Sequence, residues 1–352
     1  MNHKTGGKNN MKNPFKNISE ADRLRALRYT KVGGSVVYAV FRFLLLMSIG
    51  FIIIYPLLYM VVTSISAPTS FTNGTRVWIP TEFEIADNYE KAFYALNYVK
   101  SALNTFKYEI VSALLSVASC AVIGYGFARF NFKGKKLLTG VLFLTILMPD
   151  IMLLVPRVIN FTNIDFLYIG HGLEALINWL GSLFDLDWSK VGEVLTPDIS
   201  DTVLTMWLPS VLGVGLRSGV LIYIYIQFFT SLPRELEEAA WVDGAGPFKT
   251  FLRIAVPSSS VVFITVLVFS LIWHWNDSLL AGVYLQTDST LAVTLSNIDD
   301  WLGAIYTIYG GTPQYASAIM AACLLFIAPM LIFYMFIQRG FVESIDRVGI
   351  TG

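Results

Sequence analysis

The chain has 352 residues, of which 55% are hydrophobic and only 14% are charged, and its mean hydropathy is +0.60. Soluble globular domains carry about 25% charged residues, so this composition excludes an ordinary soluble protein and indicates a membrane protein. The 25 basic and 25 acidic residues cancel. A chain without net charge has no overall field that would attract nucleic acid, which excludes that class of partner.

Six apolar stretches follow a polar and basic N-terminal arm, residues 1–40. A helix needs roughly 20 apolar residues to cross the hydrocarbon core of a bilayer, and each stretch is long enough. The first is longer than the core of a signal peptide, so we expect it to stay as an uncleaved helix. We predict an all-α membrane protein with six transmembrane helices within 41–337. The predicted spans are 41–63, 103–128, 137–156, 203–229, 257–282 and 315–337.

The third span and the segment after it depart from a plain apolar helix. Pro149 and Pro156 interrupt the third span, which is tolerated where neighbours or water satisfy the freed carbonyls. Residues 166–184 then carry an apolar stripe opposed by polar side chains. This amphipathic pattern is typical of a helix that lies at an interface or on a neighbour, so we do not count it as a span.

The basic residues give the orientation of the six spans. Outside the spans, 17 lysines and arginines lie on the side of both termini, and 5 lie on the other side. Because positively charged loops stay in the cytoplasm, we predict that both termini, with the tail 338–352 and the loop 230–257, are cytoplasmic. Counting 166–184 as a seventh span would move that loop and the C-terminus outside, against this bias.

The loop between the fourth and fifth spans predicts a charged helix-turn-helix, which we call the elbow and define as residues 230–257. Pro233 suits a first helical turn, Gly244 suits a C-terminal cap, and Pro247 restarts a helix that runs to Pro257. One face of the first helix carries Leu236, Ala239, Ala240 and Asp243. The elbow either packs on its own bundle or serves as a lever that another protein grips.

The elbow resembles the EAA loop of binding-protein-dependent ABC importer permeases. That pattern is Glu-Ala-Ala, three residues, Gly, nine residues, Ile, one residue and Leu-Pro. Here it is met by Glu238-Ala239-Ala240, Gly244, Ile254 and Val256-Pro257, with valine in place of leucine as the one departure. A spaced pattern over 20 residues is far more specific than a single short motif.

Other segments resemble the carbohydrate-uptake branch of that family, in the position of the second permease of maltose-type systems. They are Gly124–Gly134, Trp275–Asp277 and Gln338–Val342, which occur in the family's order. The resemblance covers about 100–345 apart from residues 165–200, which look like an added extracytoplasmic insertion. It implies the six-helix type I importer fold in a bacterial plasma membrane.

The resemblance also implies roles and partners. Glu238 would contact a basic residue of a cytoplasmic ATPase dimer, Ala239 and Ala240 would allow close packing, and Gly244 would form the bend. Asp243, Ile254 and Pro257 complete the expected ATPase-coupling set. The chain has no phosphate-binding Gly-x-x-x-x-Gly-Lys-Ser/Thr motif, so ATP and Mg²⁺ are expected on the ATPase, with no cofactor and no catalytic residue here. The other expected partners are a second permease, an extracytoplasmic solute-binding protein, a sugar and membrane lipid.

Polar side chains inside the spans are candidates for a substrate path, because an arginine or aspartate at a helix centre costs about 2.5–3.5 kcal/mol on insertion scales. They are Asp150, Arg217, His274, Asn276 and Asp277. Aromatic faces for a sugar could come from Trp275, Tyr223 and Tyr225. Two structural alternatives stay open: an Asp150–Arg217 pair that only holds spans together, and an internally bonded His274. The three histidines are far apart and predict no metal site.

The leading hypothesis is therefore a permease subunit that forms a sugar path with a partner permease. A permease for another solute, such as a peptide or phosphate, would share the elbow. An ATP-independent secondary transporter is a third hypothesis, although it has no use for a cytoplasmic docking elbow. A membrane enzyme would need converging titratable groups, for which Asp150 and His274 are a thin foundation.

Overall fold

The computed structural model describes residues 20–68, 79–80, 82–162, 199–305 and 315–350. Within these ranges the secondary structure is helical, apart from an isolated antiparallel bridge between Ser66 and Phe83. The predicted amphipathic stretch 166–184 and nearly all of the predicted insertion lie outside the described residues. The chain divides into two compact units, Met1–Met60 and Val61–Gly352.

The first unit consists mainly of α1 (Glu20–Ile65), which continues into the second unit. Its segment Ser35–Ile65 is long and apolar enough to cross a membrane. It contains the first predicted span, 41–63, as a continuous helix with Pro56 inside it. At 1.5 Å per residue, the 46 residues of α1 extend over roughly 70 Å, so the helix reaches well beyond the apolar stretch.

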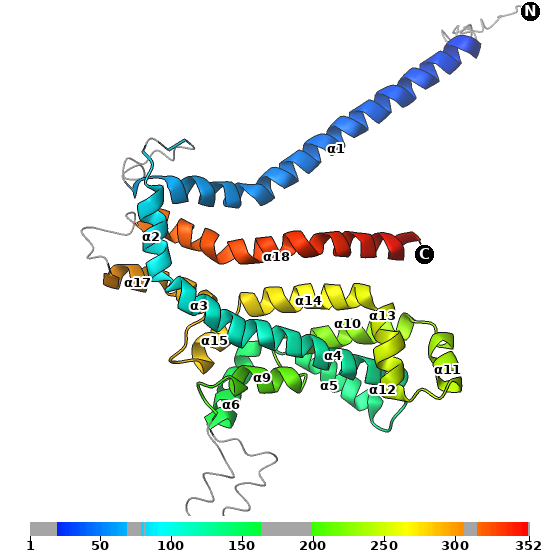
Figure 1. The fold of residues 1–352 in the computed structure, drawn as a ribbon. Coiled ribbons are helices and arrows are strands. Elements are labelled where there is room, and N and C mark those ends of the chain that lie inside the picture. The colour runs from blue at the N-terminus through cyan, green and yellow to red at the C-terminus, as the bar shows by residue number, and fades with distance from the viewer. Residues whose placement is uncertain (1–19, 69–78, 81, 163–198, 306–314, 351–352) are drawn as a thin grey trace, which may run out of the picture. The chain divides into compact units, whose positions relative to one another are not determined.

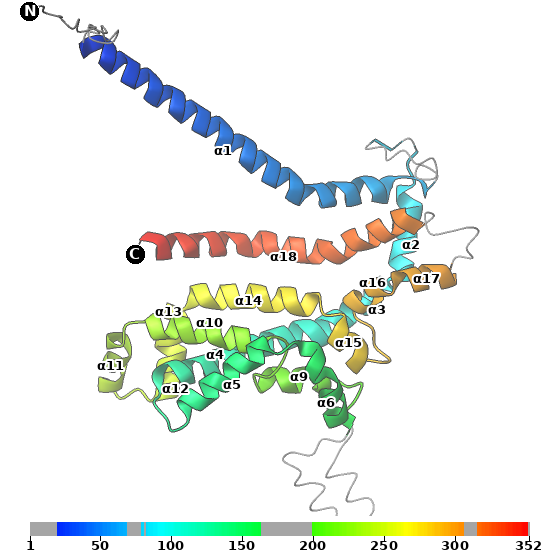
Figure 2. The same ribbon diagram turned by 180° about the vertical axis from the view of Figure 1, so that it is seen from behind.

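The second unit is built around α4 (Val111–Arg129). It packs against α10 (Ser218–Ser231) and α14 (Ser260–Trp275), and α14 in turn packs against α18 (Ala316–Ile350) (Figures 1 and 2). The contact between α4 and α10 is close because Gly124 has no side chain: a Cβ there would lie 2.4 Å from the Cβ of Tyr225. Only glycine lets the two backbones approach so closely.

The third predicted span is interrupted, as the prolines predict. α5 (Lys135–Leu147) and α6 (Asp150–Thr162) meet at an angle of 104°. Met148 between them is extended, with ψ of 125°, as expected for a residue before proline, where the ring excludes the helical conformation. Pro156 lies inside α6, so the break occurs at Pro149 and not at both prolines.

The prediction of one continuous helix over 203–229 is wrong. α9 (Leu204–Val211) ends early, and α10 begins only at Ser218. The intervening turn contains two residues with left-handed backbone, Gly213 at φ 70° and Arg217 at φ 49°. Such residues cannot continue a right-handed helix, so Arg217 precedes the first residue of α10 instead of lying in the middle of a span.

The fifth predicted span, 257–282, also has different limits. The chain bends by 83° where α12 (Pro247–Thr250), the π-helix η4 (Phe251–Ala255) and α13 (Val256–Ser258) meet α14. At the other end α14 stops at Trp275, and the short helix α15 (Leu279–Tyr284) follows. The predicted segment is therefore one long helix flanked by two bends.

Length and apolar composition give a count of possible spans. Among the described residues, Ser35–Ile65, Tyr98–Arg129 and Ala316–Gln338 qualify alone, and the two bent pairs raise the number to five. The remaining predicted region contributes the short apolar helix α10. All six predicted regions are thus helical, although only three contain a single uninterrupted helix of spanning length.

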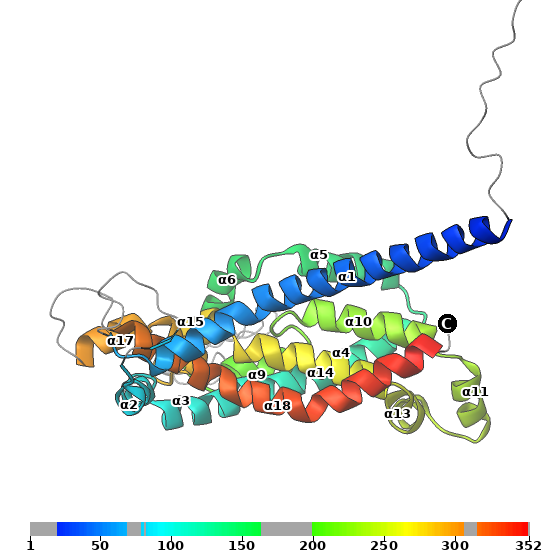
Figure 3. The same ribbon diagram turned by 90° about the horizontal axis from the view of Figure 1, so that it is seen from above.

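Short helices cover one end of the second unit, and the elbow lies at the other (Figure 3). The short helices include α2 (Ile85–Ala95), α3 (Tyr98–Asn104), the π-helix η2 (Thr105–Ile110), α16 (Leu291–Ser296) and α17 (Ile298–Ile305). Apolar side chains of α2, α3, α16 and α17 pack with the start of α18 around Leu302 and Ala321. The bundle therefore joins two structurally different ends.

Candidate functional site

The elbow forms the predicted helix-turn-helix. Its first helix, α11 (Glu235–Val242), has three acidic residues in its first turn, where the helix dipole favours negative charge. The helix ends at Gly244, whose φ is 78° and whose N–H donates to the carbonyl of Trp241 at 3.0 Å. The N–H of Ala245 donates to Ala240 at 2.9 Å. The left-handed backbone at the end of α11 favours glycine, which explains why the sequence has Gly244 at this position.

One side of α11 faces the chain's own bundle. Glu237 and Ala240, three residues apart on the same helical face, are both buried. The Nε of Arg129, the last residue of α4, donates to Oε1 of Glu237 at 2.8 Å, and its Nη2 donates to the carbonyl of Leu232 at 3.1 Å. Both charged side chains are only 4% exposed. The elbow is thus attached to the end of α4.

The other side of α11 is open. Glu238, Ala239 and Asp243 are exposed, and large apolar side chains are exposed beside them. Trp241 is 47% exposed and Val242 is 88% exposed. Other exposed apolar residues of the elbow are Leu236, Phe248 and Leu252. In this chain the open face combines acidic and apolar groups, which suits a protein partner better than water.

The predicted docking face needs one correction. Ala240 was expected beside Ala239 on the surface offered to a partner, but it is buried within this chain. The helical turn rotates Ala240 to the side of Glu237, away from Glu238 and Ala239. Of the remaining coupling residues, Ile254 is half-buried in η4 and Pro257 is exposed in α13.

Sequence reasoning missed the pairing of Arg129 with Glu237. The two residues are 108 positions apart, and no local pattern shows that Glu237, among the three glutamates of α11, faces inward. The available signal was the spacing of Glu237 and Ala240, which places them on one helical face. That spacing does not say which face is buried.

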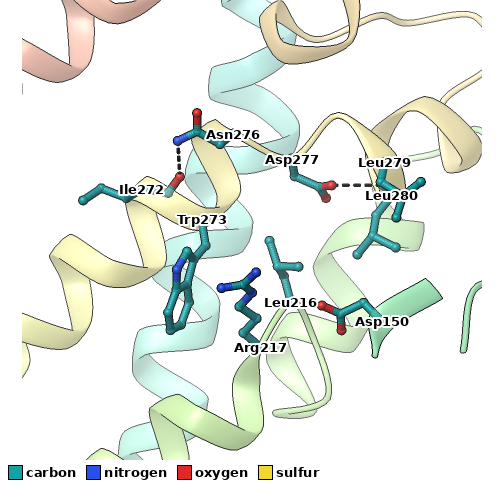
Figure 4. A pocket seen from close by; sticks show the side chains of 9 residues that line it. All are labelled: Asp150, Leu216, Arg217, Ile272, Trp273, Asn276, Asp277, Leu279 and Leu280. Atoms are coloured by element: carbon teal, nitrogen blue, oxygen red, sulfur yellow. Dashed lines mark hydrogen bonds between the residues drawn. The ribbon is translucent and has the colours of Figure 1, made fainter. Parts of the chain in front are cut away.

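A polar cavity of about 240 Å³ lies where the starts of α6 and α10 meet the end of α14 (Figure 4). Four of the residues predicted for a substrate path line it together: Asp150, Arg217, Asn276 and Asp277. The other lining side chains are Leu216, Ile272, Trp273, Leu279 and Leu280. Residues from three predicted spans are therefore brought to one place, which we call the polar pocket.

Charged groups of the polar pocket have few partners. The guanidinium of Arg217 lies 5.1 Å from the ring centroid of Trp273 (Figure 4), a cation–π contact. Asp277 accepts a hydrogen bond from the N–H of Leu280 at Oδ1, while its buried Oδ2 has no donor among the described residues. A buried acceptor without a donor is costly.

The structure contradicts one of the alternatives considered for this region. Asp150 and Arg217 line the same pocket, yet within the described residues no ion pair of 4.0 Å or less joins them. Asp150 begins α6 after the bend, and Arg217 is directed toward Trp273 instead. A salt bridge between Asp150 and Arg217 therefore does not hold these spans together.

Four predicted path residues do not line the polar pocket. Tyr225 is fully buried in the core and stacks on Phe229, and Tyr223 contacts the ring of Phe143. The other two, His274 and Trp275, are buried on α14. Both tyrosine rings thus pack against aromatic side chains of this chain, Tyr225 in the core and Tyr223 half-buried.

Hydrogen bonds explain the positions of His274 and Trp275. Nδ1 of His274 donates to the carbonyl of Ser270 at 2.8 Å, which is the internally bonded alternative for this residue. Nε1 of Trp275 donates to the carbonyl of Phe326 at 3.2 Å and so joins α14 to α18. The aromatic side chain of the polar pocket is Trp273, which the sequence prediction missed by two positions.

Another buried polar group was not singled out from the sequence. Glu109, in η2, is fully buried, and neither of its carboxyl oxygens has a hydrogen-bond donor among the described residues. Single π-helical turns often occur at functional positions. Within the described ranges, three or more His, Cys, Asp or Glu side chains are nowhere grouped so that they could hold a metal ion.

The fold and the elbow define a helical, multi-pass membrane transport subunit. The model of the family described as "Binding-protein-dependent transport system inner membrane component" matches residues 121–347. The chain belongs to this family. The predicted family and the all-α membrane fold are thereby confirmed.

Curated relatives agree with this assignment. The alpha-glucoside transport system permease protein AglG of Rhizobium meliloti is 26% identical over 285 residues, which are 80% of this chain and 65% of that protein. The trehalose transport system permease protein SugB of Mycobacterium tuberculosis is 24% identical, over 84% of this chain and 92% of its own length. The galactooligosaccharides transport system permease protein GanQ of Bacillus subtilis is 25% identical, over 89% and 95%.

A solved structure has the same fold. It is described as a "bacterial ABC transporter involved in the import of the acidic polysaccharide alginate", and one of its chains matches with a TM-score of 0.61 and 18% identity. The match covers 92% of this chain and 99% of that chain. The two chains therefore share their fold over nearly their whole length.

Proposed function

We propose that this chain is one of two permease subunits of a bacterial carbohydrate importer driven by ATP hydrolysis on separate subunits. Relatives named for alpha-glucosides, trehalose and galactooligosaccharides support a sugar or oligosaccharide as the substrate. The chain itself is a transport subunit, and ATP with Mg²⁺ would be bound by a cytoplasmic ATPase dimer. A solute-binding protein would deliver the sugar at the outer end.

The open face of the elbow is the observation that carries this proposal. Glu238 and Ala239 are exposed on the side of α11 opposite the buried Glu237. Around them are the exposed apolar side chains of α11, Leu236, Trp241 and Val242, of which Val242 is the most exposed. In the proposed complex Glu238 meets a basic residue of the ATPase, Ala239 allows close approach, and the apolar groups enter its groove. Closure of the ATPase dimer then displaces the elbow.

The polar pocket is the proposed contribution of this chain to the sugar path. Arg217 has several N–H donors with no acceptor among the described residues, while Asp150 and the buried Oδ2 of Asp277 can accept. A sugar hydroxyl both donates and accepts, so vicinal hydroxyls can satisfy an arginine and a carboxylate together. Trp273 supplies the flat apolar surface that sugar rings favour.

The proposed orientation places both termini and the elbow in the cytoplasm. It rests on the 17 basic residues on that side against 5 on the other. In the structure the elbow and the helices α2, α3 and α17 lie at opposite ends of the second unit (Figure 3). Cysteine labelling of Val242, which is exposed on the elbow, would test the orientation, since labelling only from outside the cell would contradict it.

Replacing Glu238 and Gly244 together tests the docking role. We expect the double variant Glu238→Lys/Gly244→Val to insert normally but to lose ATP-driven uptake in proteoliposomes with its partner subunits. Valine is strained at φ 78°, and lysine repels a basic partner. Glu235→Lys, at an exposed glutamate of the same helix, is the matched control. Undiminished uptake by the double variant would contradict the proposal.

Two other functions differ from this one in measurable ways. A permease for a non-sugar solute would share the elbow and the fold, so it differs from a sugar permease only in what is transported. Binding of a panel of glycans and non-sugar solutes to the companion solute-binding protein separates these. An ATP-independent transporter would instead move solute in proteoliposomes that contain this chain without an ATPase.

A further inference from the structure

The ion pair between Arg129 and Glu237 joins three separate parts of the fold. Arg129 ends α4, Glu237 lies on α11, and the carbonyl of Leu232, at the end of α10, accepts the second hydrogen bond of the same guanidinium. The N···O distances are 2.8 Å to Glu237 and 3.1 Å to Leu232. One side chain therefore connects the elbow to α4, a helix that is not adjacent to it along the chain.

An aromatic layer beside the ion pair joins the same elements. The ring of Tyr125, one turn before Arg129 on α4, lies 4.9 Å from the ring of Phe251 in η4 and 5.4 Å from that of Phe229 in α10. Phe229 and Phe251 are themselves 6.2 Å apart. These apolar contacts keep the elements close together but have no preferred direction. The hydrogen-bonded ion pair is directional, so it also fixes the orientation of α11 relative to α4.

Burial makes this ion pair hard to separate. Both side chains are 4% exposed, so moving the elbow away from α4 would leave two charges without partners in a region with little water. Breaking a buried pair by removing one partner is strongly destabilising. An elbow that is displaced by a partner would therefore carry α4 with it instead of sliding along it.

We propose that Arg129 and Glu237 are positioning residues that make α4, α10 and the elbow move as one body during transport. This inference rests on the proposed docking of the elbow to an ATPase. Covalent linkage alone passes a displacement of the elbow to α10 and α14. The ion pair adds α4, which is in close contact with α10 at Gly124 and reaches toward the outer end through η2.

Spin-label distances between α4 and the elbow test this inference in the complete transporter. Val122 on α4 and Lys249 on α12 of the elbow are exposed and can be replaced by cysteine. Cys323 is changed to serine, and Cys120 can stay because it is buried. We expect one narrow distance distribution that is the same in the nucleotide-free and ATP-bound states. A shift between the two states larger than the width of the distribution would overturn the proposal.

Two variants connect this distance to function. In Glu237→Ala we expect a broadened distance and loss of the stimulation of ATP hydrolysis by loaded binding protein, while basal hydrolysis and co-purification with the ATPase persist. Glu235→Ala, also on α11 but exposed, should behave as the parent does. If Glu237→Ala keeps both the parent's distance and its stimulation, the ion pair is not a positioning device.

The double variant Arg129→Met/Glu237→Leu covers the case in which the single variant does not fold. Apolar replacement of a buried pair is often neutral for stability, so we expect a folded protein whose elbow has lost directional attachment and whose stimulation falls to the basal level. Parental distance and stimulation in this variant would overturn the inference. Failure of the parent itself to co-purify with an ATPase would instead contradict the proposed docking.

Discussion

Two arginines lie near opposite ends of α10 and differ in burial and in hydrogen-bond partners. At the C-terminal end, Arg129 of α4 is buried and bonded to Glu237 and to the carbonyl of Leu232. At the N-terminal end, Arg217 is exposed in the polar pocket, where its guanidinium lies over the ring of Trp273 and forms no ion pair within the described residues. One arginine is satisfied by the protein, and the other has hydrogen-bonding capacity left over.

This difference separates structural charges from candidate ligand-binding charges. A buried charge that already has its partners contributes to position and stability, and its removal leaves the partner uncompensated. A charge that faces a cavity without a partner costs little to remove from the folded chain, but it can bind an incoming group. The same residue type is therefore expected to give opposite results in stability and transport assays.

Removing each arginine in turn is the strongest test of this comparison. We expect Arg129→Ala to lower the free energy of unfolding by about 3–5 kcal/mol, because Glu237 stays buried without its partner. Arg217→Ala should change it by less than about 1 kcal/mol, since that side chain is exposed. Thermal unfolding of the two variants in the same detergent measures both. Equal losses would abolish the distinction.

Arg217→Leu should affect substrate instead of stability. Losing a hydrogen bond to a charged group costs about 1.5–3 kcal/mol, so we expect the substrate concentration for half-maximal uptake to rise tenfold or more at parental expression. Asp277→Asn is the companion variant, because it keeps the shape of the side chain while removing the charge. Unchanged uptake by both variants would mean that the polar pocket does not meet the substrate.

The contact between α4 and α10 can be tested at neighbouring glycines. A Cβ on Gly124 would lie 2.4 Å from the Cβ of Tyr225, whereas one on Gly126 would meet nothing within 4 Å. Overpacking typically costs 1–3 kcal/mol, so Gly124→Ala should destabilise by about that amount and Gly126→Ala should not destabilise. If the two variants have the same melting temperature, the contact between α4 and α10 at Gly124 is not tight.

The smallest effect on stability is expected from Asp288 and the neighbouring side chains that interact with it. The hydrogen bond that Asp288 accepts from Tyr108 lowers the pKa of Asp288 below its usual range, and Lys107 and Lys100 act in the same direction. A lowered pKa in the folded state means that the contribution to stability is present above the unfolded pKa of about 3.9 and is lost as pH falls through the folded value. We expect less than about 1 kcal/mol, because solvent screens the set.

Unfolding measured between pH 6 and pH 2 would show this contribution. The free energy of unfolding of the parent should fall at the low end of this pH range. Asp288→Asn lacks the carboxylate, so its profile should be flatter there. A parent and a variant with parallel profiles would show that the Asp288 group adds nothing measurable to the folded state.

Local sequence signals predicted the elbow well and the polar pocket incompletely. Gly244, Pro247 and the acidic first turn of α11 act through residues a few positions away, so their effects follow from spacing alone. The family, the helical fold and the break at Pro149 were predicted for the same reason. Ala240 was placed on the wrong face because the orientation of α11 depends on Arg129, which is distant in the sequence.

The polar pocket depends on where helices end, and that was harder to predict. Apolar composition continues through 203–229, so the turn that places Arg217 at the start of α10 leaves only weak signals such as Gly213. One turn of helix separates Trp273, which lines the pocket, from the predicted Asn276 and Asp277, while Trp275 between them faces Phe326. Hydropathy cannot distinguish two tryptophans that are two residues apart on one helix.

The backbone of Arg217 has a consequence for how this position could change. With φ of 49°, it has a conformation that glycine or asparagine adopts more readily than a long side chain does. Arg217→Gly should therefore relieve backbone strain, and at the same time it removes the positively charged side chain from the polar pocket. A chain optimised for folding alone would carry glycine here, and the proposed contact of Arg217 with substrate would account for the arginine.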